Sequence, residues 1–182
     1  DTEVLLALYA AKGERMLTDL RGMFAFAIWD TRRRGMFLAR DMFGVKPLYY
    51  SDDGATLRAA SEVKALLAGG SVDTEPEPAG HVGFFLWGSV PEPYTMFRGI
   101  RALPAGHRLW ISDSGERELR SFADVNELFQ MPEMRSPIRL ERDARGELRE
   151  ALIDSVRHHL VADVDVGVFL SAGLDSTTLA AL

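Results

Sequence analysis

The sequence of 182 residues contains no cysteine, so the chain holds neither a disulfide bond nor a thiol nucleophile. It has no apolar run approaching the roughly 18 residues that a membrane-spanning helix needs. Basic residues are the minority among the charges, with 21 Lys and Arg against 27 Asp and Glu, whereas a nucleic-acid-binding domain usually carries a basic face. From these absences we expect a protein of a reducing, cytoplasmic compartment that binds neither membranes nor nucleic acid.

The sequence contains enough apolar material for a folded core. Hydrophobic residues make up 47% of the chain, which is typical of globular proteins and argues against disorder. The chain begins at Asp1 without an initiator Met, and it stops at Leu182, a few residues into a predicted helix. A helix that short is not stable by itself. We therefore expect the chain to be an internal piece of a longer protein.

The first half of the chain has the pattern of one helix followed by antiparallel strands. Thr2–Lys12 is predicted to be an amphipathic helix, because its apolar residues recur at helical spacing and Gly13 follows as a stop signal. Turn residues separate four predicted strands, which is typical of hairpins. These strands are Met23–Trp29, Gly35–Arg40, Pro47–Tyr50 and Thr56–Ala60. Because Met23–Trp29 is apolar throughout, we expect it to be covered on both faces.

The next elements are short and lie among prolines. We expect two short helices, then a last hairpin, then an extended linker. The segments concerned are the helices Ser61–Leu67 and Ala79–Trp87, the hairpin strands His107–Ile111 and Leu119–Phe122, and the linker Asp124–Leu140.

A change of architecture is predicted near residue 140. Glu141–Leu160 has the pattern of a long amphipathic helix, Val164–Leu170 of a buried strand, and Ser171–Ser176 of a tight loop before a final helix. The core stripe of the long helix is expected to consist of Leu148, Leu152, Val156 and Leu160. Such a helix, strand and loop open a parallel α/β domain. The expected fold class is therefore α+β followed by α/β.

The clearest chemistry lies where the last predicted strand meets the last helix. The chain passes there through Ser171, Ala172 and Gly173 into the helix. The first N–H groups of a helix have no intrahelical partner, and the helix dipole adds positive potential, so such a turn binds phosphate groups. Small residues let a phosphate approach the backbone, and the hydroxyl groups of Ser171 and Ser176 add hydrogen-bond donors.

Asp175 is unusual in a phosphate-binding turn, because a carboxylate repels an anion. Its place becomes favourable if a magnesium ion bridges it to the phosphates. Two other nucleotide-binding patterns are absent, namely G-x-G-x-x-G and G-x-x-x-x-G-K followed by Ser or Thr. The pattern alone leaves open an ordinary strand-to-helix turn of an α/β domain.

The loop Ser171–Ser176 reads Ser-Ala-Gly-Leu-Asp-Ser and resembles the pyrophosphate loop, Ser-Gly-Gly-x-Asp-Ser, of the ATP pyrophosphatases. The resemblance implies ATP and magnesium as cofactors, with magnesium held at Asp175 through the phosphates. It implies that the nucleotide is bound by Leu170, Ser171, Ala172, Gly173, Leu174, Asp175 and Ser176. Ala172 departs from the glycine of the family pattern, and its methyl group is tolerated only if the residue keeps a negative φ angle.

Five further segments resemble the glutaminase half of glutamine-dependent asparagine synthetases and follow the same order. They are Asp1–Glu3, Leu20–Asp30, Leu38–Tyr50, Ala60–Leu66 and Ile100–His107. On these motifs the chain is identified as a member of the glutamine-hydrolysing asparagine synthetase family. The resemblance implies a class II glutamine amidotransferase domain followed by the start of an ATP-pyrophosphatase domain.

The resemblance also implies boundaries, a fold and a reaction. Residues 1–122 would be the C-terminal part of an αββα sandwich of the N-terminal nucleophile hydrolase type, residues 123–140 a linker, and residues 141–182 the start of the synthetase domain. Ammonia released from glutamine would amidate the side chain of aspartate after its adenylation by ATP. The nucleophile of such enzymes is an N-terminal cysteine, so no catalytic residue is expected within this chain.

Asp1 is the residue that the resemblance assigns to glutamine, since a carboxylate pairs well with the α-ammonium group. The alternative role for Asp1 is a simple helix cap. The expected partners are the small molecules glutamine, aspartate and ATP, and a homodimer is among the expected assemblies.

Two other functions remain open from the sequence. Relatives with this fold amidate other carboxylates in natural-product or cell-surface polymer pathways, and Gly88–Tyr94 resembles the bacterial branch in which the acceptor varies. The second alternative is a non-catalytic remnant, because the chain lacks the cysteine nucleophile.

Overall fold

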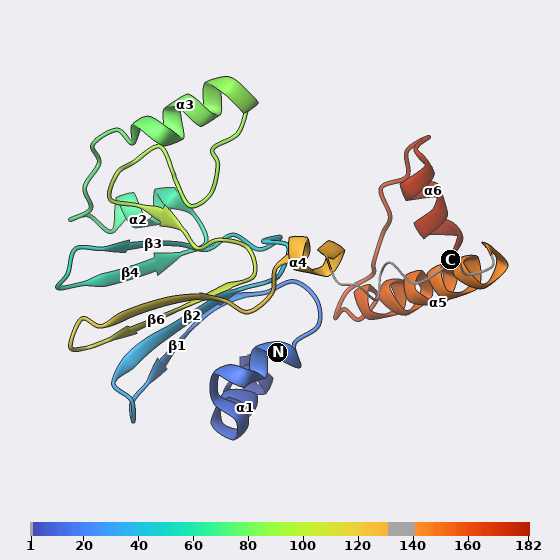
Figure 1. The fold of residues 1–182 in the computed structure, drawn as a ribbon, viewed down its shortest axis with the longest axis horizontal. Coiled ribbons are helices and arrows are strands. Elements are labelled where there is room, and N and C mark those ends of the chain that lie inside the picture. The colour runs from blue at the N-terminus through green and yellow to red at the C-terminus, as the bar shows by residue number, and fades with distance from the viewer. Residues whose placement is uncertain (1, 131–140) are drawn as a thin grey trace. The chain divides into compact units, whose positions relative to one another are not determined.

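Two antiparallel β-sheets form the centre of the first part of the chain (Figure 1). The computed structural model describes residues 2–130 and 141–182, and the chain divides into two compact units, Asp1–Glu127 and Leu128–Leu182. In the four-stranded sheet the order is β1-β2-β6-β7, and in the three-stranded sheet it is β4-β3-β5. The strands are β1 (Ala25–Asp30), β2 (Gly35–Arg40), β3 (Tyr49–Asp52), β4 (Leu57–Ala60), β5 (Arg101–Ala102), β6 (His107–Ser112) and β7 (Arg117–Ser121).

Helices cover the outer faces of both sheets and complete four layers (Figure 1). The helix α1 (Thr2–Lys12) and the 3-10 helix η1 (Gly13–Thr18) pack on the four-stranded sheet, while α2 (Val63–Ala68) and α3 (Pro78–Trp87) lie on the far side of the three-stranded sheet. This α/β/β/α order matches the predicted sandwich, and it is consistent with a fold of the N-terminal nucleophile hydrolase type.

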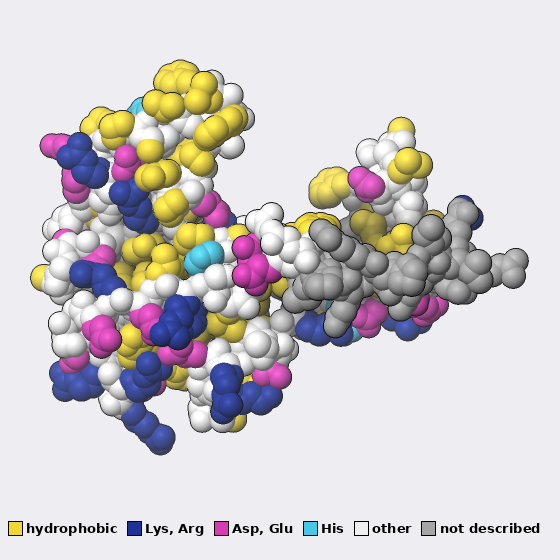
Figure 2. Space-filling model, in the orientation of Figure 1, with side chains coloured by type: hydrophobic (Ala, Val, Ile, Leu, Met, Phe, Trp, Pro, Cys, Tyr) yellow, Lys and Arg dark blue, Asp and Glu magenta, His cyan; other side chains and the backbone are white. Residues whose placement is uncertain are grey.

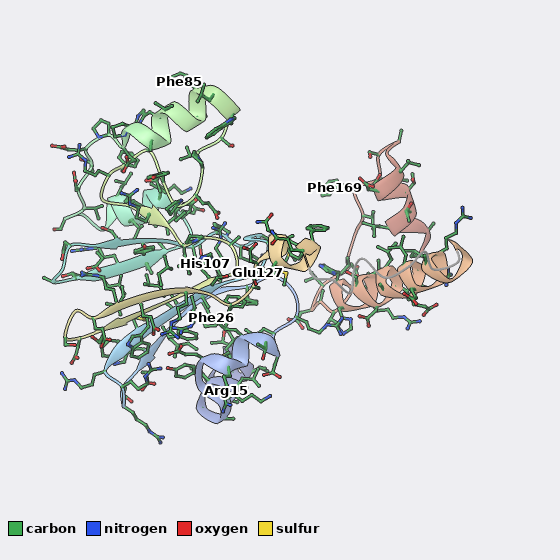
Figure 3. All side chains as sticks on the ribbon, in the orientation of Figure 1. Arg15, Phe26, Phe85, His107, Glu127 and Phe169 are labelled. Carbon is green, nitrogen blue, oxygen red and sulfur yellow. The ribbon has the colours of Figure 1, made fainter. Side chains whose placement is uncertain are left out.

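Two apolar cores separate these layers. The core between the helices and the four-stranded sheet contains Met16, Leu17, Ile28, Phe37, Ala39 and Trp110, with Phe26 beside them in Figure 3. The core between the two sheets contains Leu38, Leu48, Leu103, Leu109 and Ile111. Neighbouring residues of β2 thus point into different cores, because successive side chains of a strand lie on opposite faces.

The hairpins and helices predicted for this unit are largely confirmed. The predicted helix Thr2–Lys12 is α1, and the other predicted helices and strands overlap α2, α3, β1–β4, β6 and β7 with small shifts at their ends. The β1–β2 turn is closed by Asp30, whose carboxylate accepts the N–H groups of Arg32 at 2.8 Å and Arg33 at 2.9 Å. Gly13, with a left-handed φ of 59°, ends α1 as predicted, and the 3-10 helix η1 begins at the same residue.

The expectation that Met23–Trp29 is covered on both faces is wrong. Within the described residues β1 is an edge strand, and Trp29 exposes 52% of its surface. Ile28 lies in the core under α1, whereas Ala27 and Trp29 on the opposite face of β1 are exposed. The strands buried on both faces are instead β2 and β6, which lie inside the sheet.

The chain between the two units and beyond also differs from expectation. The predicted linker Asp124–Leu140 contains the helix α4 (Val125–Gln130), where Asp124 caps the first turn by accepting the Asn126 N–H at 2.8 Å. The rest of that linker, residues 131–140, lies outside the described residues. The long helix is confirmed as α5 (Glu141–His159), although Leu148 and Leu160 of its predicted core stripe are exposed.

The predicted buried strand Val164–Leu170 does not form. In the described structure this segment is an extended, exposed connection between α5 and α6 (Leu174–Ala181), and Val164 and Phe169 are 79% and 103% exposed. A parallel strand needs neighbouring strands to take its backbone hydrogen bonds, and no described strand pairs with this segment. Separately, no described helix is both long and apolar enough to cross a membrane.

Asp41, directly after β2, is a buried carboxylate that binds several backbone N–H groups. Only 1% of its surface is exposed, and its carboxylate accepts four backbone N–H groups, those of Phe24 (3.3 Å), Phe43 (3.1 Å), Val45 (3.0 Å) and Lys46 (3.0 Å). Burial by itself raises the pKa of the Asp41 carboxyl, but these hydrogen bonds outweigh burial and hold the pKa below its ordinary value.

Arg40 completes the same network from the preceding position. Its guanidinium forms an ion pair with Glu92, whose other oxygen accepts the Ala105 N–H at 3.0 Å. It also donates to three backbone carbonyls, those of Gly44, Lys46 and Leu103, at 2.7, 2.8 and 2.7 Å. The end of β2, the loop after it and the segment before β6 are therefore held by two adjacent side chains.

We expect Asp41→Asn to lower the free energy of unfolding by about 3 kcal/mol, because the Asn amide group meets N–H donors that a carboxylate oxygen now accepts. Urea denaturation followed by tryptophan fluorescence measures the change. Because folding lowers this pKa, the stabilisation is complete above the unfolded-state pKa of about 3.9 and is lost as the pH falls below that value towards the folded-state pKa.

The matched control is Asp113→Asn, which alters an exposed carboxylate that pairs with Arg34 at the surface. Such a pair contributes at most about 1 kcal/mol, so this variant should stay close to the wild type. Equal stability of the two variants would contradict the role assigned to Asp41.

Candidate functional site

The loop Ser171–Ser176 is shaped by the hydroxyl groups of its two serines. Ser171 Oγ and Ser176 Oγ lie 2.8 Å apart. Ser171 Oγ accepts the Gly173 N–H at 3.2 Å, and Ser176 Oγ accepts the Ser171 N–H at 3.3 Å. The two hydroxyl groups thus close the loop across the first turn of α6.

Gly173 is the residue at which the loop becomes a helix. It has the extended conformation of an N-cap, with φ -77° and ψ 150°, and no side chain caps the helix there. The first N–H groups of α6 therefore have no intrahelical acceptor. A Cβ atom at Gly173 would lie 3.2 Å from Ser171 Oγ, so a side chain at this position would crowd the loop.

The loop suits a cation that is also bound by phosphate oxygens. It does not suit a metal ion held by protein side chains alone. Asp175 lies in the first turn of α6, and the described residues contain no group of three His, Cys, Asp or Glu side chains placed to hold a metal ion. One carboxylate beside helix N–H groups fits magnesium that also takes phosphate oxygens. Among described non-glycine residues, positive φ angles occur at Arg34 and Ser71, so Ala172 meets the condition that its methyl group imposes.

The structure brings together only part of the predicted nucleotide-binding set. Ser171, Gly173 and Ser176 are joined by hydrogen bonds. Leu170 and Leu174 are exposed by 66% and 85%, and no apolar wall forms around them within the described part of the chain. The predicted glutamine residue, Asp1, lies outside the described residues.

The helix that follows Asp1 is firmly held against the four-stranded sheet. The Tyr9 hydroxyl donates to the Asp30 carboxylate at 2.9 Å, and the Tyr9 ring stacks on Phe37 with 5.4 Å between ring centroids. Burial, together with the Asp30 hydrogen bond, raises the pKa of Tyr9 to about 12. A cavity of about 560 Å³ opens beside the first turn of α1, and Thr2 and Arg21 are among its lining residues.

A charged cluster fixes η1, the segment that follows α1. Glu14 forms ion pairs with Arg33 and with Arg108, each at 2.7 Å. The Arg33 guanidinium also lies 3.8 Å from the centre of the Trp110 ring, a cation–π contact. The start of the chain is thus held to the sheet by charge as well as by apolar packing.

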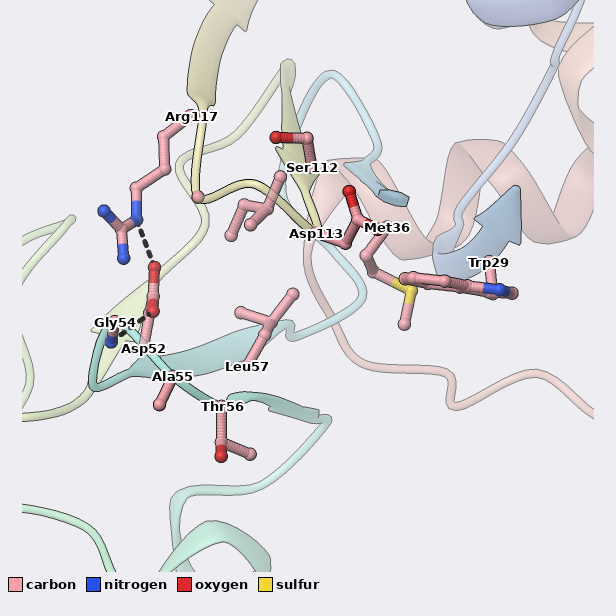
Figure 4. Close-up of a pocket in the computed structure, with 12 residues that line it drawn as sticks. Trp29, Met36, Asp52, Gly54, Ala55, Thr56, Leu57, Ser112, Asp113 and Arg117 are labelled. Atoms are coloured by element: carbon pink, nitrogen blue, oxygen red, sulfur yellow. Dashed lines mark hydrogen bonds and ion pairs between the residues drawn. The ribbon is translucent and has the colours of Figure 1, made fainter. Parts of the chain in front are cut away.

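A second hollow, of about 330 Å³, lies between the two sheets at their hairpin ends (Figure 4). An ion pair between Asp52 of β3 and Arg117 of β7 spans it and lowers the pKa of Asp52, while Trp29 and Met36 form an apolar wall. None of the described residues that the sequence predicts for a site lines this hollow. The ion pair joins the sheets, and we assign it a structural role.

Comparison with known protein families decides the class of the first unit. Residues 1–123, more than half of the chain, match the family described as a glutamine amidotransferase domain. The chain belongs to this family. Residues 147–182 of the same amidotransferase chain match the family described as asparagine synthase. The predicted order, an amidotransferase domain followed by the start of a synthase domain, is confirmed.

Curated relatives of this amidotransferase chain carry matching names. It is 42% identical over 188 residues to a provisionally named glutamine-hydrolysing asparagine synthetase of Mycobacterium tuberculosis, and 37% identical over 183 residues to asparagine synthetase B of Escherichia coli. It is 34% identical over 193 residues to the amidase chyE of Penicillium rubens. Each match covers 100% of this chain but only 26% to 28% of the relative.

Sequence reasoning missed the side chains that position α1 in this amidotransferase domain. Asp30 serves both the β1–β2 turn and the Tyr9 hydroxyl, and its partner lies 21 positions away. An aspartate at the end of a strand signals the turn. Its contact with Tyr9 depends on how α1 crosses the sheet, which no local pattern shows.

We expect Tyr9→Phe to lower the free energy of unfolding by about 1 kcal/mol near neutral pH, because the Asp30 carboxylate loses a donor. Folding raises the pKa of Tyr9, so this contribution persists below the ordinary tyrosine pKa of about 10 and disappears as the pH rises towards 12. Denaturation at several pH values, compared with the wild type, measures both effects. A difference that grows above pH 10 would refute the assignment.

Proposed function

We propose that the protein to which this chain belongs is a glutamine-dependent asparagine synthetase. The observation that carries the proposal is the succession, in one chain, of an amidotransferase match over residues 1–123 and an asparagine synthase match over residues 147–182. The first domain would supply ammonia from glutamine. The second would consume ATP to adenylate the side-chain carboxylate of aspartate, and ammonia would then displace AMP to give asparagine.

The proposed ATP site is the loop Ser171–Ser176 with the N-terminus of α6. The N–H groups of α6 and the hydroxyl groups of Ser171 and Ser176 would donate to phosphate oxygens. Asp175 would hold magnesium together with the phosphates, and that ion supplies neutralisation of their charge. The short contacts that close the loop support this proposal, because they already gather the donors at one end of a helix.

The proposed glutamine site lies at the start of α1, where Asp1 would pair with the α-ammonium group of the substrate. Two features support this location. The cavity beside the first turn of α1 is large enough for an amino acid, and the helix is held in place by Tyr9 and Asp30. The cysteine nucleophile of the glutaminase reaction would come from a part of the protein outside residues 1–182, which contain no cysteine.

A second candidate function keeps the chemistry but changes the acceptor. One relative with 34% identity bears the name of an amidase rather than of an asparagine synthetase. Another carboxylate in a natural-product or cell-surface polymer pathway is therefore the alternative substrate, and a non-catalytic relative is the remaining possibility.

The first test is pyrophosphate release by the full-length protein with ATP, magnesium and ammonium chloride, with and without aspartate. We expect release only when aspartate is present, accompanied by stoichiometric asparagine. Release that is equal without aspartate, or supported by a different carboxylate, would reject asparagine as the product. No release with any acceptor would support the non-catalytic alternative.

Substitutions at the two proposed sites should separate the half-reactions. Asp1→Asn should reduce glutamine-supported synthesis at least tenfold and leave ammonium-supported synthesis unchanged, because only the former needs the α-ammonium contact. Asp175→Asn should reduce both by a similar factor, because both consume ATP. The rates are measured side by side with each nitrogen source.

The matched control on α6 is Thr177→Ala. Among the described residues its hydroxyl group donates to the carbonyls of Gly173 at 2.8 Å and Leu174 at 3.1 Å, so its loss should leave both activities near the wild-type rate. If Asp175→Asn behaves like Thr177→Ala, the loop is not the ATP site.

A further inference from the structure

The hollow between the two sheets at their hairpin ends has an apolar wall on one side and charged groups on the other (Figure 4). Trp29, Met36 and Leu57 supply the apolar surface, and Asp52 and Arg117 form the charged side. Its volume of about 330 Å³ falls within the range of roughly 300–1,000 Å³ that small-molecule sites occupy. Such sites combine mainly apolar walls with a few polar groups. The hollow therefore has the size and the composition of a ligand-binding pocket.

The turn between β3 and β4 gives this hollow an ordered rim. Asp52 accepts the Gly54 N–H at 2.9 Å, and Asp53 accepts the N–H groups of Ala55 at 2.9 Å and Thr56 at 2.7 Å. Because Gly54, Ala55 and Thr56 are small, the turn borders the hollow without filling it. A rim that is already ordered has little conformational freedom to lose when a ligand binds.

The carboxylates of the hollow are already paired with arginine. Asp52, whose side chain is 12% exposed, uses one oxygen for the Gly54 N–H and the other for the ion pair with Arg117. Asp113 pairs with Arg34 at the rim. Among the described residues that line the hollow, no unpaired carboxylate is left to attract a cation.

Arg117, in contrast, has unused donors. A guanidinium carries five N–H groups, and the ion pair with Asp52 uses the one on Nε. Within residues 2–130 and 141–182 its two terminal nitrogens make no hydrogen bond, and the side chain is 48% exposed. Two such nitrogens can bind both oxygens of a carboxylate at once. The charged side of the hollow therefore favours an anion.

Trp29 provides the apolar counterpart to Arg117. It lies in the edge strand β1, and 52% of its surface is exposed although it borders the hollow. In Figure 4 its indole ring lies beside the Met36 side chain. A large exposed ring favours packing against a second ring. Since a water molecule occupies about 30 Å³ of liquid, the 330 Å³ of the hollow hold roughly 11 water molecules, or one ring with a short side chain.

We propose that the hollow binds a small aromatic carboxylic acid. Its carboxylate pairs with the terminal nitrogens of Arg117, and its ring packs on Trp29 and Met36. The ion pair with Asp52 stays in place and orients the guanidinium. An aromatic amino acid fits less well, because its ammonium group meets no unpaired carboxylate among the described lining residues.

This proposal does not depend on the proposed enzymatic activity. Neither Asp1 nor the loop Ser171–Ser176 lines the hollow. A ligand there would leave both proposed substrate sites open.

The test is isothermal titration calorimetry of the full-length protein with 3-phenylpropionate as the probe. We expect saturable binding to one site per chain. The analogues 3-phenyl-1-propanol, which lacks the carboxylate, and propionate, which lacks the ring, should bind about tenfold more weakly or worse. Phenylalanine, which adds an ammonium group, should also bind more weakly. Absence of binding by 3-phenylpropionate, or equal affinity for the alcohol or for phenylalanine, would overturn the proposal.

Two variants locate the site on the protein. Trp29→Ala should weaken the binding of 3-phenylpropionate about tenfold. Arg117→Lys should do the same, because lysine keeps a positive charge beside Asp52 but lacks the planar pair of terminal nitrogens. Both side chains are about half exposed, so the melting temperature of each variant should stay close to that of the wild type.

The matched control is Arg120→Lys. Arg120 lies in β7 three positions after Arg117 and therefore on the other face of the strand, so this variant should keep the wild-type affinity. An equal loss of affinity in the control would contradict the assignment to this hollow. Wild-type affinity in either Trp29→Ala or Arg117→Lys would also overturn the proposal, since the probe would then bind elsewhere.

Discussion

The adjacent pair Arg40–Asp41 is the constraint on which the first unit depends. These side chains lie at the end of β2 and satisfy the backbone of the loop that leads out of it, of the start of β1 and of the segment before β6. Each of those segments is irregular, and a buried irregular backbone needs side-chain partners. The pair supplies them at one point, where both sheets and the connection between them converge.

The end of β2 also contacts the segment through which the chain leaves the two sheets. The Asp41 carbonyl accepts the Gly106 N–H at 2.9 Å, and the Gly106 carbonyl accepts the Phe122 N–H at 2.9 Å. A Cβ atom at Gly106 would lie 2.0 Å from the Ala123 carbonyl oxygen. Glycine is therefore required where the backbone at Gly106 passes the backbone at Ala123. The chain after β7 is therefore linked, through Gly106, to the backbone carbonyl of Asp41, 65 positions before Gly106.

The two proposed substrate sites are supported in different ways. α1 is held by long-range contacts of Tyr9 and Glu14 with the sheet, so its first turn has a rigid base. The loop Ser171–Ser176 is held by its own hydroxyl groups in an exposed unit. This difference explains why the loop was recognisable from six consecutive residues, whereas the support of α1 was not recognisable from any short segment.

The sequence by itself determined the periodic elements and the family motifs. The helix Thr2–Lys12, the hairpins and the phosphate-loop pattern all rest on local spacing, which side-chain alternation and turn chemistry impose directly. Tertiary structure decided which strand lies at an edge, that Val164–Leu170 forms no strand among the described residues, and that α3 turns its apolar face outward (Figure 2). Those outcomes depend on which surfaces meet, because a strand is completed by a neighbour and a helix is oriented by its closest contact. Apolar residues alone could not show that Gly80 and Gly83, rather than Phe85, face inward.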